Sequence, residues 1–487
     1  MPKGNRLVVA IVLVLFAVEG TLMAQTSGPS PKESGKSDAA AEFAALYNAY
    51  AARYEPLLKA AELAGWEADT TGTDAAFAKR KEAQNALVVL HHDHATFLKL
   101  KSLKERGEIT DPLLERQLAV MYREFLAGEA DPEIQKRLVA IEAEIVQVFN
   151  LHRSTVDGKP LTENEVRTVL SESKDSKEAE KAWKAYMEVG AKVDRKLREA
   201  VDLRNQMAHQ LGFRNFYAMQ LELGEIDEQE LMKLFDELDR LTIGPFTELK
   251  KEIDAAAAKR YGIAVADLRP WHYGDLFFQD APASETAGLE AIYQDRDLAA
   301  LAKTYYGGIG LDVEGILKRS DLYEKPGKSP HAFACDIDRA DDIRILCNLK
   351  PNLYWADTLL HELGHGVYDE YIDRDLPFIL RTPSHSITTE GVALLLGAMS
   401  KNEEYLAKVL QLPPEKAGEL AVQARRALRS ERLIFSRWAQ VMVRFELAMY
   451  DNPNQDLGKL WWDLKKRYQL LNPTDDVSRP DYGAKNH

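Results

Sequence analysis

The chain has 487 residues, of which 45% are hydrophobic and 29% are charged, and this composition excludes a disordered chain, a fibre and a multi-span membrane protein. The formal net charge is −14, from 77 acidic and 63 basic side chains, and there is no strongly basic block, so nucleic acid is not an expected partner. The 2 cysteines are too few for a disulfide-stabilised scaffold.

The N-terminus has the pattern of a targeting signal. Lys3 and Arg6 precede an apolar run from Leu7 to Val18, and Ala24 offers a small residue at a cleavage position. We therefore predict a signal peptide at 1–24, with an uncleaved anchor as the alternative. The mature chain would be secreted or periplasmic, with no stable membrane insertion after cleavage. Residues 25–38, rich in Ser, Gly, Pro and Lys, predict a flexible linker.

From residue 39 onward the chain predicts a mainly α-helical domain that extends to residue 487. Aromatic and aliphatic residues recur three and four positions apart, as on one face of a helix, and similar patterning covers most of 75–265 and 394–470. The first such set is Phe43, Leu46, Tyr47, Tyr50, Tyr54, Leu57 and Leu58. We divide the domain at about residue 265 into a half at 39–265 and a half at 266–487.

Residues 331–347 break the helical pattern and predict two short strands around a polar turn. Cys335 and Cys347 lie about equally far from that turn, so they could face each other and form a disulfide in an oxidising compartment. The alternative is two small buried thiols.

The most informative motif is H-E-x-x-H from His361 to His365. On a helix, residues four apart lie on one face, so both imidazoles could bind one Zn²⁺. Glu362 lies one residue after the first histidine, where its carboxylate could reach a zinc-bound water rather than the metal. It would accept a proton from that water and pass one to the leaving amine of a peptide.

A catalytic zinc needs three protein ligands and one open position. Glu390, 25 residues after His365, begins another apolar helical run and is the predicted third ligand, with His385 as a competing one. The site would hold one Zn²⁺ per chain. The run His91-His92-Asp93-His94 could form a second metal site, although a polar helix face is the preferred interpretation.

These residues resemble the angiotensin-converting-enzyme family of zinc dipeptidyl carboxypeptidases, in particular its shorter bacterial members. The resemblance rests on short segments that keep their order between residue 270 and the end of the chain, whereas 39–265 match only in helical character. The matching segments are Gly274-Asp275 with Gln279, His331-Ala332-Phe333-Ala334, His361 to His365, Asp375-Leu376-Pro377, Leu380-Arg381, Glu390, and Gly483-Ala484-Lys485 with His487.

The resemblance implies roles for the matching residues. His331 and the strand from Ala332 to Ala334 would bind the substrate backbone by edge pairing. Gln279 and Lys485 would bind the terminal carboxylate of a peptide, which sets the release of dipeptides. His487 would donate to the oxyanion of the reaction. Family members often depend on chloride, and the resemblance leaves open whether chloride is a further ligand here.

Two departures from the family pattern affect the predicted activity. Two tyrosines that the family carries after the histidine matched by His487 are missing, so we expect a C-terminally incomplete chain. The family also has an aspartate four residues after the third ligand, oriented toward a zinc histidine, where this chain has Leu394. The partners of the zinc-binding histidines must therefore come from elsewhere.

The resemblance thus implies a large helical ellipsoid in which two subdomains enclose a deep cleft, with a short β-hairpin beside the zinc site. The expected activity is zinc-dependent hydrolysis of short peptides with release of C-terminal dipeptides. Two alternatives stay open. One is an oligopeptidase that cuts internally; the other is a catalytically impaired peptide- or zinc-binding protein that lacks the C-terminal catalytic segment. The oligomeric state is not predicted.

Overall fold

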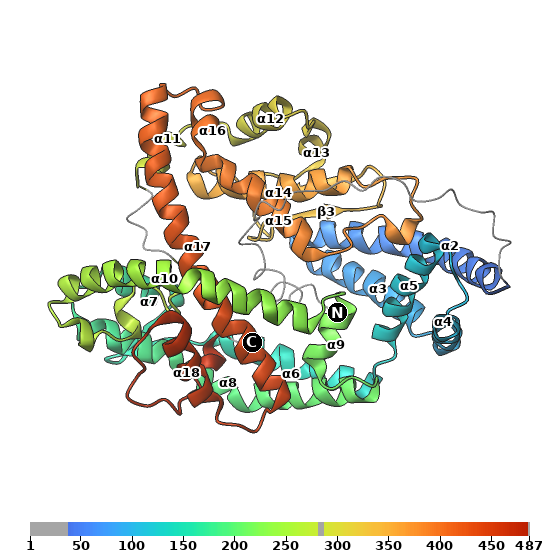
Figure 1. The fold of residues 1–487 in the computed structure, drawn as a ribbon, viewed down its shortest axis with the longest axis horizontal. Helices are drawn as coiled ribbons and strands as arrows, with labels where there is room; N and C mark the ends of the chain where they lie inside the picture. Colours follow the sequence, from blue (N-terminus) through green and yellow to red (C-terminus); the bar gives the residue numbers. More distant parts are fainter. Residues whose placement is uncertain (1–37, 281–286, 486–487) are drawn as a thin grey trace. The chain divides into compact units, whose positions relative to one another are not determined.

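A computed structural model describes residues 38–280 and 287–485. The predicted signal peptide, the predicted linker up to residue 37 and His487 lie outside the described residues. Helices dominate the described part, which also contains two two-stranded sheets, so the predicted mainly α class is confirmed (Figure 1). Within these residues, no helix is both long enough and apolar enough to cross a membrane.

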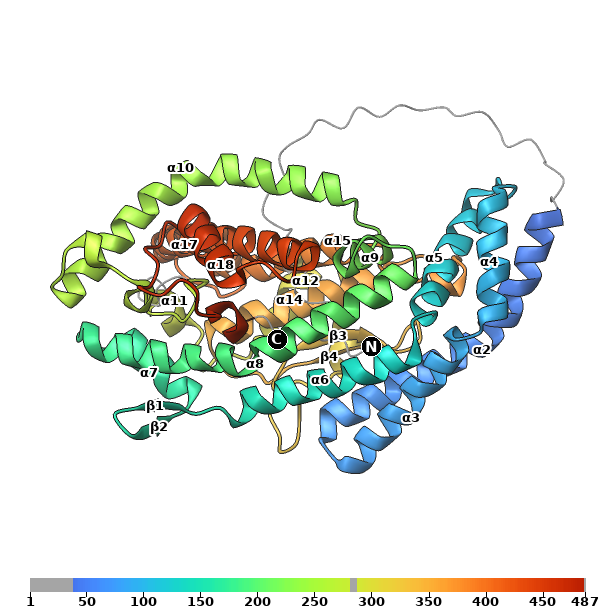
Figure 2. The same cartoon turned by 90° about the horizontal axis from the view of Figure 1, so that it is seen from below.

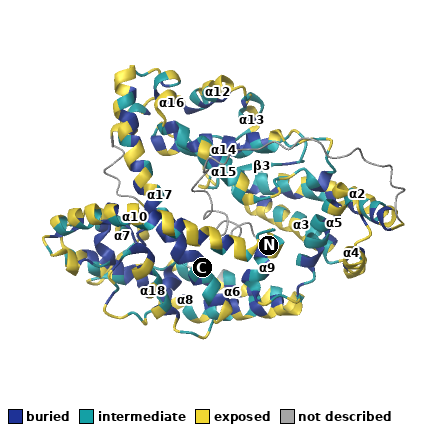
Figure 3. Ribbon diagram, in the orientation of Figure 1, coloured by how far each residue is buried: buried dark blue, intermediate teal, exposed yellow. Residues whose placement is uncertain are grey.

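The chain folds into two compact units, each built from two separate stretches. Of the described residues, unit 1 comprises 38–129 and 287–424, and unit 2 comprises 130–280 and 425–485. The predicted halves at 39–265 and 266–487 therefore each contain stretches of both units. Most of the longer helices have one buried and one exposed face, as their spacing of apolar residues predicts (Figure 3).

Unit 1 contains the H-E-x-x-H segment and a β-hairpin. Its hydrophobic core is built around the helix from Leu353 to Glu370, with Leu359, Leu360 and Leu363 at most 1% exposed. Its elements are α2 (Asp38–Thr71), α3 (Asp74–His91), α4 (His94–Arg106), α5 (Pro112–Gly128), α11 (Ala287–Ile292), α12 (Leu298–Gly308), α13 (Glu314–Arg319), β3 (Phe333–Asp336), β4 (Ile343–Leu346), α14 (Leu353–Glu370), η5 (Phe378–Leu380), α15 (Ser386–Ala398), η6 (Met399–Lys401), α16 (Glu403–Lys408) and the start of α17 (Pro414–Asp451).

Unit 2 contains the segment with Gln279 and Lys485. One of its cores lies among α6, α8 and α9, and another includes Phe246 of α10, Phe278 and Ile434 of α17. Its elements are α6 (Pro132–Leu151), β1 (Ser154–Val156), β2 (Lys159–Leu161), α7 (Glu163–Glu172), α8 (Ser176–Gln210), α9 (Phe216–Leu223), α10 (Glu228–Tyr261), η2 (Val265–Asp267), η3 (Pro270–His272), the rest of α17, α18 (Leu457–Gln469) and η7 (Asp481–Ala484).

The β1–β2 hairpin in unit 2 was not expected from the sequence (Figure 2). Its two-residue turn is Asp157-Gly158, and both residues have positive φ angles, of 49° and 81°. An Asp-Gly pair of this conformation matches the right-handed twist of the flanking strands, which is why it closes such a short hairpin.

The predicted hairpin at 331–347 is confirmed in unit 1 as the antiparallel pair β3–β4. Of the two alternatives that the sequence left open for Cys335 and Cys347, the structure has two separate thiols, because the two cysteines are not joined. The register pairs Cys335 with Arg344 and Phe333 with Leu346, so the two cysteines are not opposite each other. Cys347 lies one residue beyond β4 and is fully buried.

Candidate metal centre

The helix α14 presents the H-E-x-x-H residues on one side and a leucine-rich face to the core of unit 1. It begins at Asn352, whose side chain accepts a hydrogen bond of 2.9 Å from the amide of Trp355 and so caps the first turn. The Tyr306 hydroxyl donates to the Leu360 carbonyl at 2.6 Å, inside the core. These contacts fix the position of the turn that carries His361 and Glu362.

Two glycines allow α15 to lie directly against α14. A Cβ atom at Gly364 would be 2.9 Å from the Cα of Ala393, and one at Gly397 would be 2.8 Å from the Asp357 carboxylate and 3.2 Å from the Cβ of His361. Real side chains do not tolerate the shorter contacts, so the helices could not approach this closely with alanine at these positions. The approach places Glu390 of α15 beside the histidines of α14.

The three predicted ligands, His361, His365 and Glu390, meet in unit 1. One Glu390 carboxylate oxygen lies 3.6 Å from Nε2 of His361, and the other lies 3.7 Å from Nε2 of His365. The three ligand atoms lie within 4.8 Å of one another, and no other group of this kind occurs in the described residues. Tetrahedral zinc at 2.0–2.2 Å from each ligand separates its ligands by about 3.4 Å, so this donor set fits the ion.

The electrostatic environment keeps the His365 imidazole neutral, which is the form that binds metals. Burial, followed by the charge of His361, lowers the pKa of His365 to about 4. The Nδ1 atom of His365 lies 2.9 Å from the hydroxyl of Thr389, so the ring can direct Nε2 toward Glu390. Burial raises the pKa of Glu390. Thr389 was missed in the sequence, although it directly precedes the predicted third ligand.

Glu362 is buried beside this group, with 8% of its surface exposed. Burial, followed by the nearby charge of Glu390, raises its pKa to about 8, and a hydrogen bond from the backbone amide of Ala334 lowers it by a smaller amount. The amide that holds Glu362 therefore comes from the β3 strand, which was expected to contact substrate.

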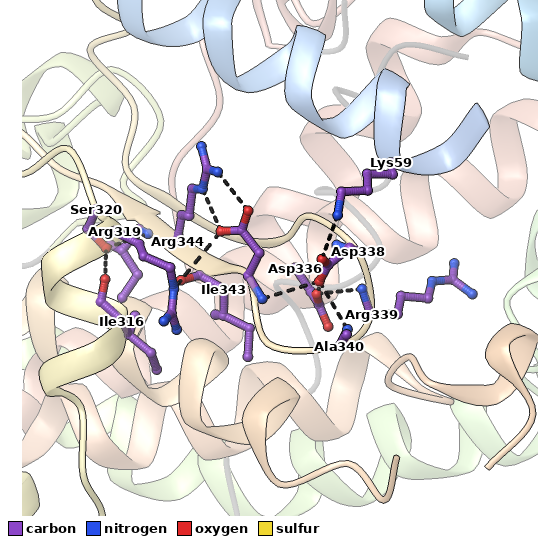
Figure 4. Close-up of polar contacts among 12 residues, drawn as sticks. Lys59, Ile316, Arg319, Ser320, Asp336, Asp338, Arg339, Ala340, Ile343 and Arg344 are labelled. Atoms are coloured by element: carbon purple, nitrogen blue, oxygen red, sulfur yellow. Dashed lines mark hydrogen bonds and ion pairs between the residues drawn. The ribbon is translucent and has the colours of Figure 1, made fainter. Parts of the chain in front are cut away.

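The β3–β4 hairpin is held at its turn and along β4 (Figure 4). At the turn, Lys59 of α2 forms an ion pair of 3.0 Å with Asp338. Along β4, Arg319 donates to the Ile343 carbonyl, and the Ser320 hydroxyl accepts from the Ile345 amide. The outer edge of β4 also pairs with residue 321 in an isolated bridge, which leaves the outer edge of β3 without a strand partner among the described residues.

The remaining predicted substrate residue of this segment, His331, is exposed and lies two residues before β3. Its backbone amide donates to the Ser329 hydroxyl at 3.4 Å. Ala332 and Ala334 are half-buried and pack against the core of unit 1. In the described structure, Ala332 and Ala334 thus pack against the core of unit 1, whereas His331 is exposed.

Gln279 and Lys485 both belong to unit 2. Gln279 lies in a loop, and Lys485 contacts that loop. The Lys485 ammonium lies 5.4 Å from the ring centroid of Phe277, two residues before Gln279, and 5.8 Å from the ring of Trp438. Burial lowers the pKa of Lys485, and the nearby Asp275 carboxylate opposes this shift. A half-buried lysine and an amide side chain near one loop can together bind a carboxylate.

The structure places the alternative metal ligands elsewhere. His385 is the residue before α15 and is not part of the metal-binding group. The histidine-rich run is not one helix face, because α3 ends at His91 and Asp93 caps α4. His91 Nε2 lies 3.1 Å from the Tyr50 hydroxyl, and His94 lies 2.5 Å from Glu129. Leu394, where the family has an aspartate, is a half-buried residue of α15.

The fold and the site together define a mainly helical protein in which two histidines and one glutamate form a group that could hold a metal ion. The model of the Peptidase_M2 family, described as angiotensin-converting enzyme, matches residues 35–249. This match confirms the predicted family resemblance and lies in the part of the chain where the sequence motifs were weakest. The chain is thus similar to the angiotensin-converting-enzyme peptidases over residues 35–249, and its bacterial origin stays a prediction.

A curated relative extends the similarity over most of the chain. The chain is 19% identical, over an alignment of 466 positions that covers 86% of the chain, to a protein of Caenorhabditis elegans named "Inactive angiotensin-converting enzyme-related protein". The chain spans 50% of the length of that relative. The matching family model is that of a peptidase family, whereas the relative's name describes an inactive protein.

Proposed function

We propose that this chain is a zinc-dependent peptidase that hydrolyses short peptides and releases dipeptides from their C-termini. The observation that carries the proposal is the approach of Glu390 to within 3.6 Å and 3.7 Å of the two histidine Nε2 atoms, with Glu362 buried next to them. The family match to Peptidase_M2 supports the same reaction class.

The ligands for zinc would be His361, His365 and Glu390, which leave a fourth position open. When bound there, zinc would supply a Lewis acid that polarises a peptide carbonyl and lowers the pKa of a water molecule. Glu362 would accept a proton on its carboxylate and return it to the leaving amine. The Ala334 amide would hold that carboxylate in place, because it is the hydrogen-bond donor to Glu362.

The substrate would bind along the outer edge of β3. Only β4 pairs with β3 among the described residues, so backbone groups of the segment from Ala332 to Ala334 can pair with an extended peptide. Because Ala334 also contacts Glu362, a peptide on this edge would lie close to the proton-transfer group.

The terminal carboxylate of the substrate would bind Gln279 and Lys485. This assignment rests on the family resemblance and on the position of the Lys485 ammonium, 5.4 Å from the ring of Phe277, which lies two residues before Gln279 in the same loop. It distinguishes dipeptide release from internal cleavage, because only an exopeptidase requires a free carboxylate at a set distance from the scissile bond. Chloride dependence is proposed only by analogy with the family.

The first experiment combines metal analysis with Glu362→Gln. We expect one zinc per chain in the wild type and in Glu362→Gln, but a loss of about 10²–10⁴-fold in kcat for the variant, since proton transfer is removed while the ligands stay. Glu370→Gln is the matched control, because Glu370 is an exposed glutamate at the end of the same helix. Equal activity of Glu362→Gln and wild type would overturn the proposed role.

The second experiment compares free-acid and C-terminally amidated peptides. Lys485→Ala should raise KM for free-acid peptides while changing the cleavage of amidated ones much less. An equal effect on both substrates would favour the internal-cutting oligopeptidase instead.

The second candidate function is a metal- or peptide-binding protein without activity, and the name of the Caenorhabditis elegans relative favours it. It predicts zinc bound through His361, His365 and Glu390 without turnover. Peptidase assays of the zinc-loaded chain, with and without chelator, separate the two functions.

A further inference from the structure

The loop that ends at Gln279 is held by buried side chains rather than by a helix or strand. Three consecutive backbone carbonyls each accept a hydrogen bond from a different buried residue of unit 2. Trp183 Nε1 donates to the Leu276 carbonyl at 2.9 Å, Lys465 Nζ donates to that of Phe277 at 2.9 Å, and Gln469 Nε2 donates to that of Phe278 at 2.6 Å.

The amide groups of the same loop are fixed from the other side. One carboxylate oxygen of Asp275 accepts from the amide of Phe277 at 3.1 Å and from the amide of Gln279 at 2.9 Å. The other oxygen lies 3.3 Å from the Arg167 guanidinium. Between these two amides, Phe278 has a φ angle of +54°, a backbone conformation that side chains other than glycine adopt only when the surroundings impose it.

Of these side chains, Gln469 makes the most direct contact with the backbone of Phe278. Its Nε2 donates to the two carbonyls that flank Phe278, that of Phe277 at 3.3 Å and that of Phe278 at 2.6 Å, and Gln469 is fully buried at the end of α18. Its Oε1 is buried and accepts no hydrogen bond in the described structure. The side chain is therefore used as a donor, and its target is the backbone immediately before Gln279.

We propose that Gln469 is a positioning residue for recognition of the peptide carboxylate. It fixes the backbone of Phe277 and Phe278. That backbone determines the direction of the Gln279 side chain and the position of the Phe277 ring next to Lys485. The inference rests on the proposed function, in which Gln279 and Lys485 bind that carboxylate. Gln469 is not expected to touch the substrate, since it contacts the opposite, buried side of the loop.

The test compares Gln469→Met with Gln440→Met. Gln440 is also fully buried in unit 2 and donates from Nε2 to a backbone carbonyl, that of Phe235, which lies outside the loop. The readout is the ratio of kcat/KM for a free-acid peptide to kcat/KM for its amide. We expect Gln469→Met to lower this ratio about tenfold, mainly through KM, because a displaced binding group loses much of its effect. Gln440→Met should keep the wild-type ratio.

A double variant tests whether Gln469 acts through Gln279. In a Gln279→Leu background, Gln469→Met should cause no further loss of the ratio, because the group that it positions is already absent. Should Gln469→Met fail to fold, Gln469→Leu is a second variant that removes the amide donors without placing an acid in the core, and it is expected to lower the ratio in the same way. Full additivity of the two changes would overturn the inference.

The outcomes separate this inference from the proposed function. If the wild type cleaves free-acid and amidated peptides equally well, the carboxylate-binding role of Gln279 and Lys485 fails, and the inference fails with it. If the wild type prefers free acids but Gln469→Met behaves like Gln440→Met, only the positioning role of Gln469 is rejected.

Discussion

Thr389 and His365 are joined by a hydrogen bond of 2.9 Å between Oγ1 and Nδ1, although they lie on different helices. In the tautomer that leaves Nε2 of His365 unprotonated, the Nδ1–H group would donate to the Thr389 hydroxyl. This contact takes the place of the carboxylate or carbonyl that often orients a metal-binding histidine. Thr389 also directly precedes Glu390, so one turn of α15 supplies a ligand and the partner of another ligand.

We therefore predict that Thr389→Val lowers zinc affinity about 10-fold to 100-fold, because removal of such an orienting partner has this effect at other zinc sites. The measurement is competition with a chelator of known affinity. Thr388→Val is the matched control, since Thr388 is the exposed neighbouring threonine of α15. An unchanged affinity in Thr389→Val would show that the hydroxyl does not orient the ring.

The close approach of α14 and α15 leads to a second prediction. In Gly364→Ala, the new Cβ would lie 2.9 Å from the Cα of Ala393, so one helix must shift. We expect a loss of about 1–3 kcal/mol in stability from overpacking, together with weaker zinc binding, because Glu390 moves with α15. Gly307→Ala in α12 has no atom within 4 Å of its new Cβ and should be neutral or stabilising. Thermal unfolding and zinc titration of both variants provide the comparison.

Arg339 and Lys59 both connect the hairpin turn to other elements of unit 1, and their contributions to the free energy of unfolding should differ. Arg339 donates to the carbonyls of Phe378 and Ile379, each at 3.3 Å, and to the Tyr54 hydroxyl at 3.2 Å. Arg339→Met should cost about 1.5–3 kcal/mol, because partly buried acceptors lose a charged donor. Lys59→Met should cost less than about 1 kcal/mol, because the Lys59 side chain in the ion pair with Asp338 is 51% exposed. Denaturant unfolding measures both, and a reversed order would contradict the assignment.

Glu446 in α17 predicts a pH dependence of stability. Burial raises its pKa to about 7, despite the opposing charge of Arg204. An unfolded glutamate has a pKa of about 4.3, so between these values the folded chain binds more protons than the unfolded chain. The contribution of this group to stability is full below pH of about 4.3 and is lost as the pH rises through about 7.

We therefore expect Glu446→Gln to reduce the fall in the unfolding midpoint between pH 5 and pH 8. The difference corresponds to on the order of 1–3 kcal/mol. Glu415→Gln, at an exposed glutamate of the same helix, is the control and should keep the wild-type slope. A Glu446→Gln profile parallel to that of the wild type would refute the prediction.

Much of the fold was readable from local patterns. The spacing of Phe43, Tyr50 and Tyr54 correctly predicted one face of a helix, and all three are at most 5% exposed. The hairpin at 331–347 was also predicted from its strands and polar turn. The β1–β2 hairpin was missed, although Asp157-Gly158 is a strong turn signal, because strands of three residues leave little alternation to detect.

Other features depended on register and packing, which local patterns do not carry. The sequence suggested that Cys335 and Cys347 lie about equally far from the turn, but the turn between Asp336 and Ile343 begins two residues after Cys335 and ends five residues before Cys347, and Cys335 pairs with Arg344. A shift of a single position in strand pairing changes which side chains oppose each other, so counting from a turn does not settle a disulfide. The division into two units, each made of two stretches, likewise follows from contacts between distant residues.

By itself, the sequence determined that the protein is mainly helical, that His361, Glu362 and His365 share one helix, and that Glu390 begins another. These properties follow from the helical period, which acts over a few residues. Only the tertiary structure decided that Glu390 meets both histidines, that Thr389 contacts His365 and that Gln469 holds the loop before Gln279. Each of these contacts joins residues from separate elements, and its geometry is set by how closely those elements pack.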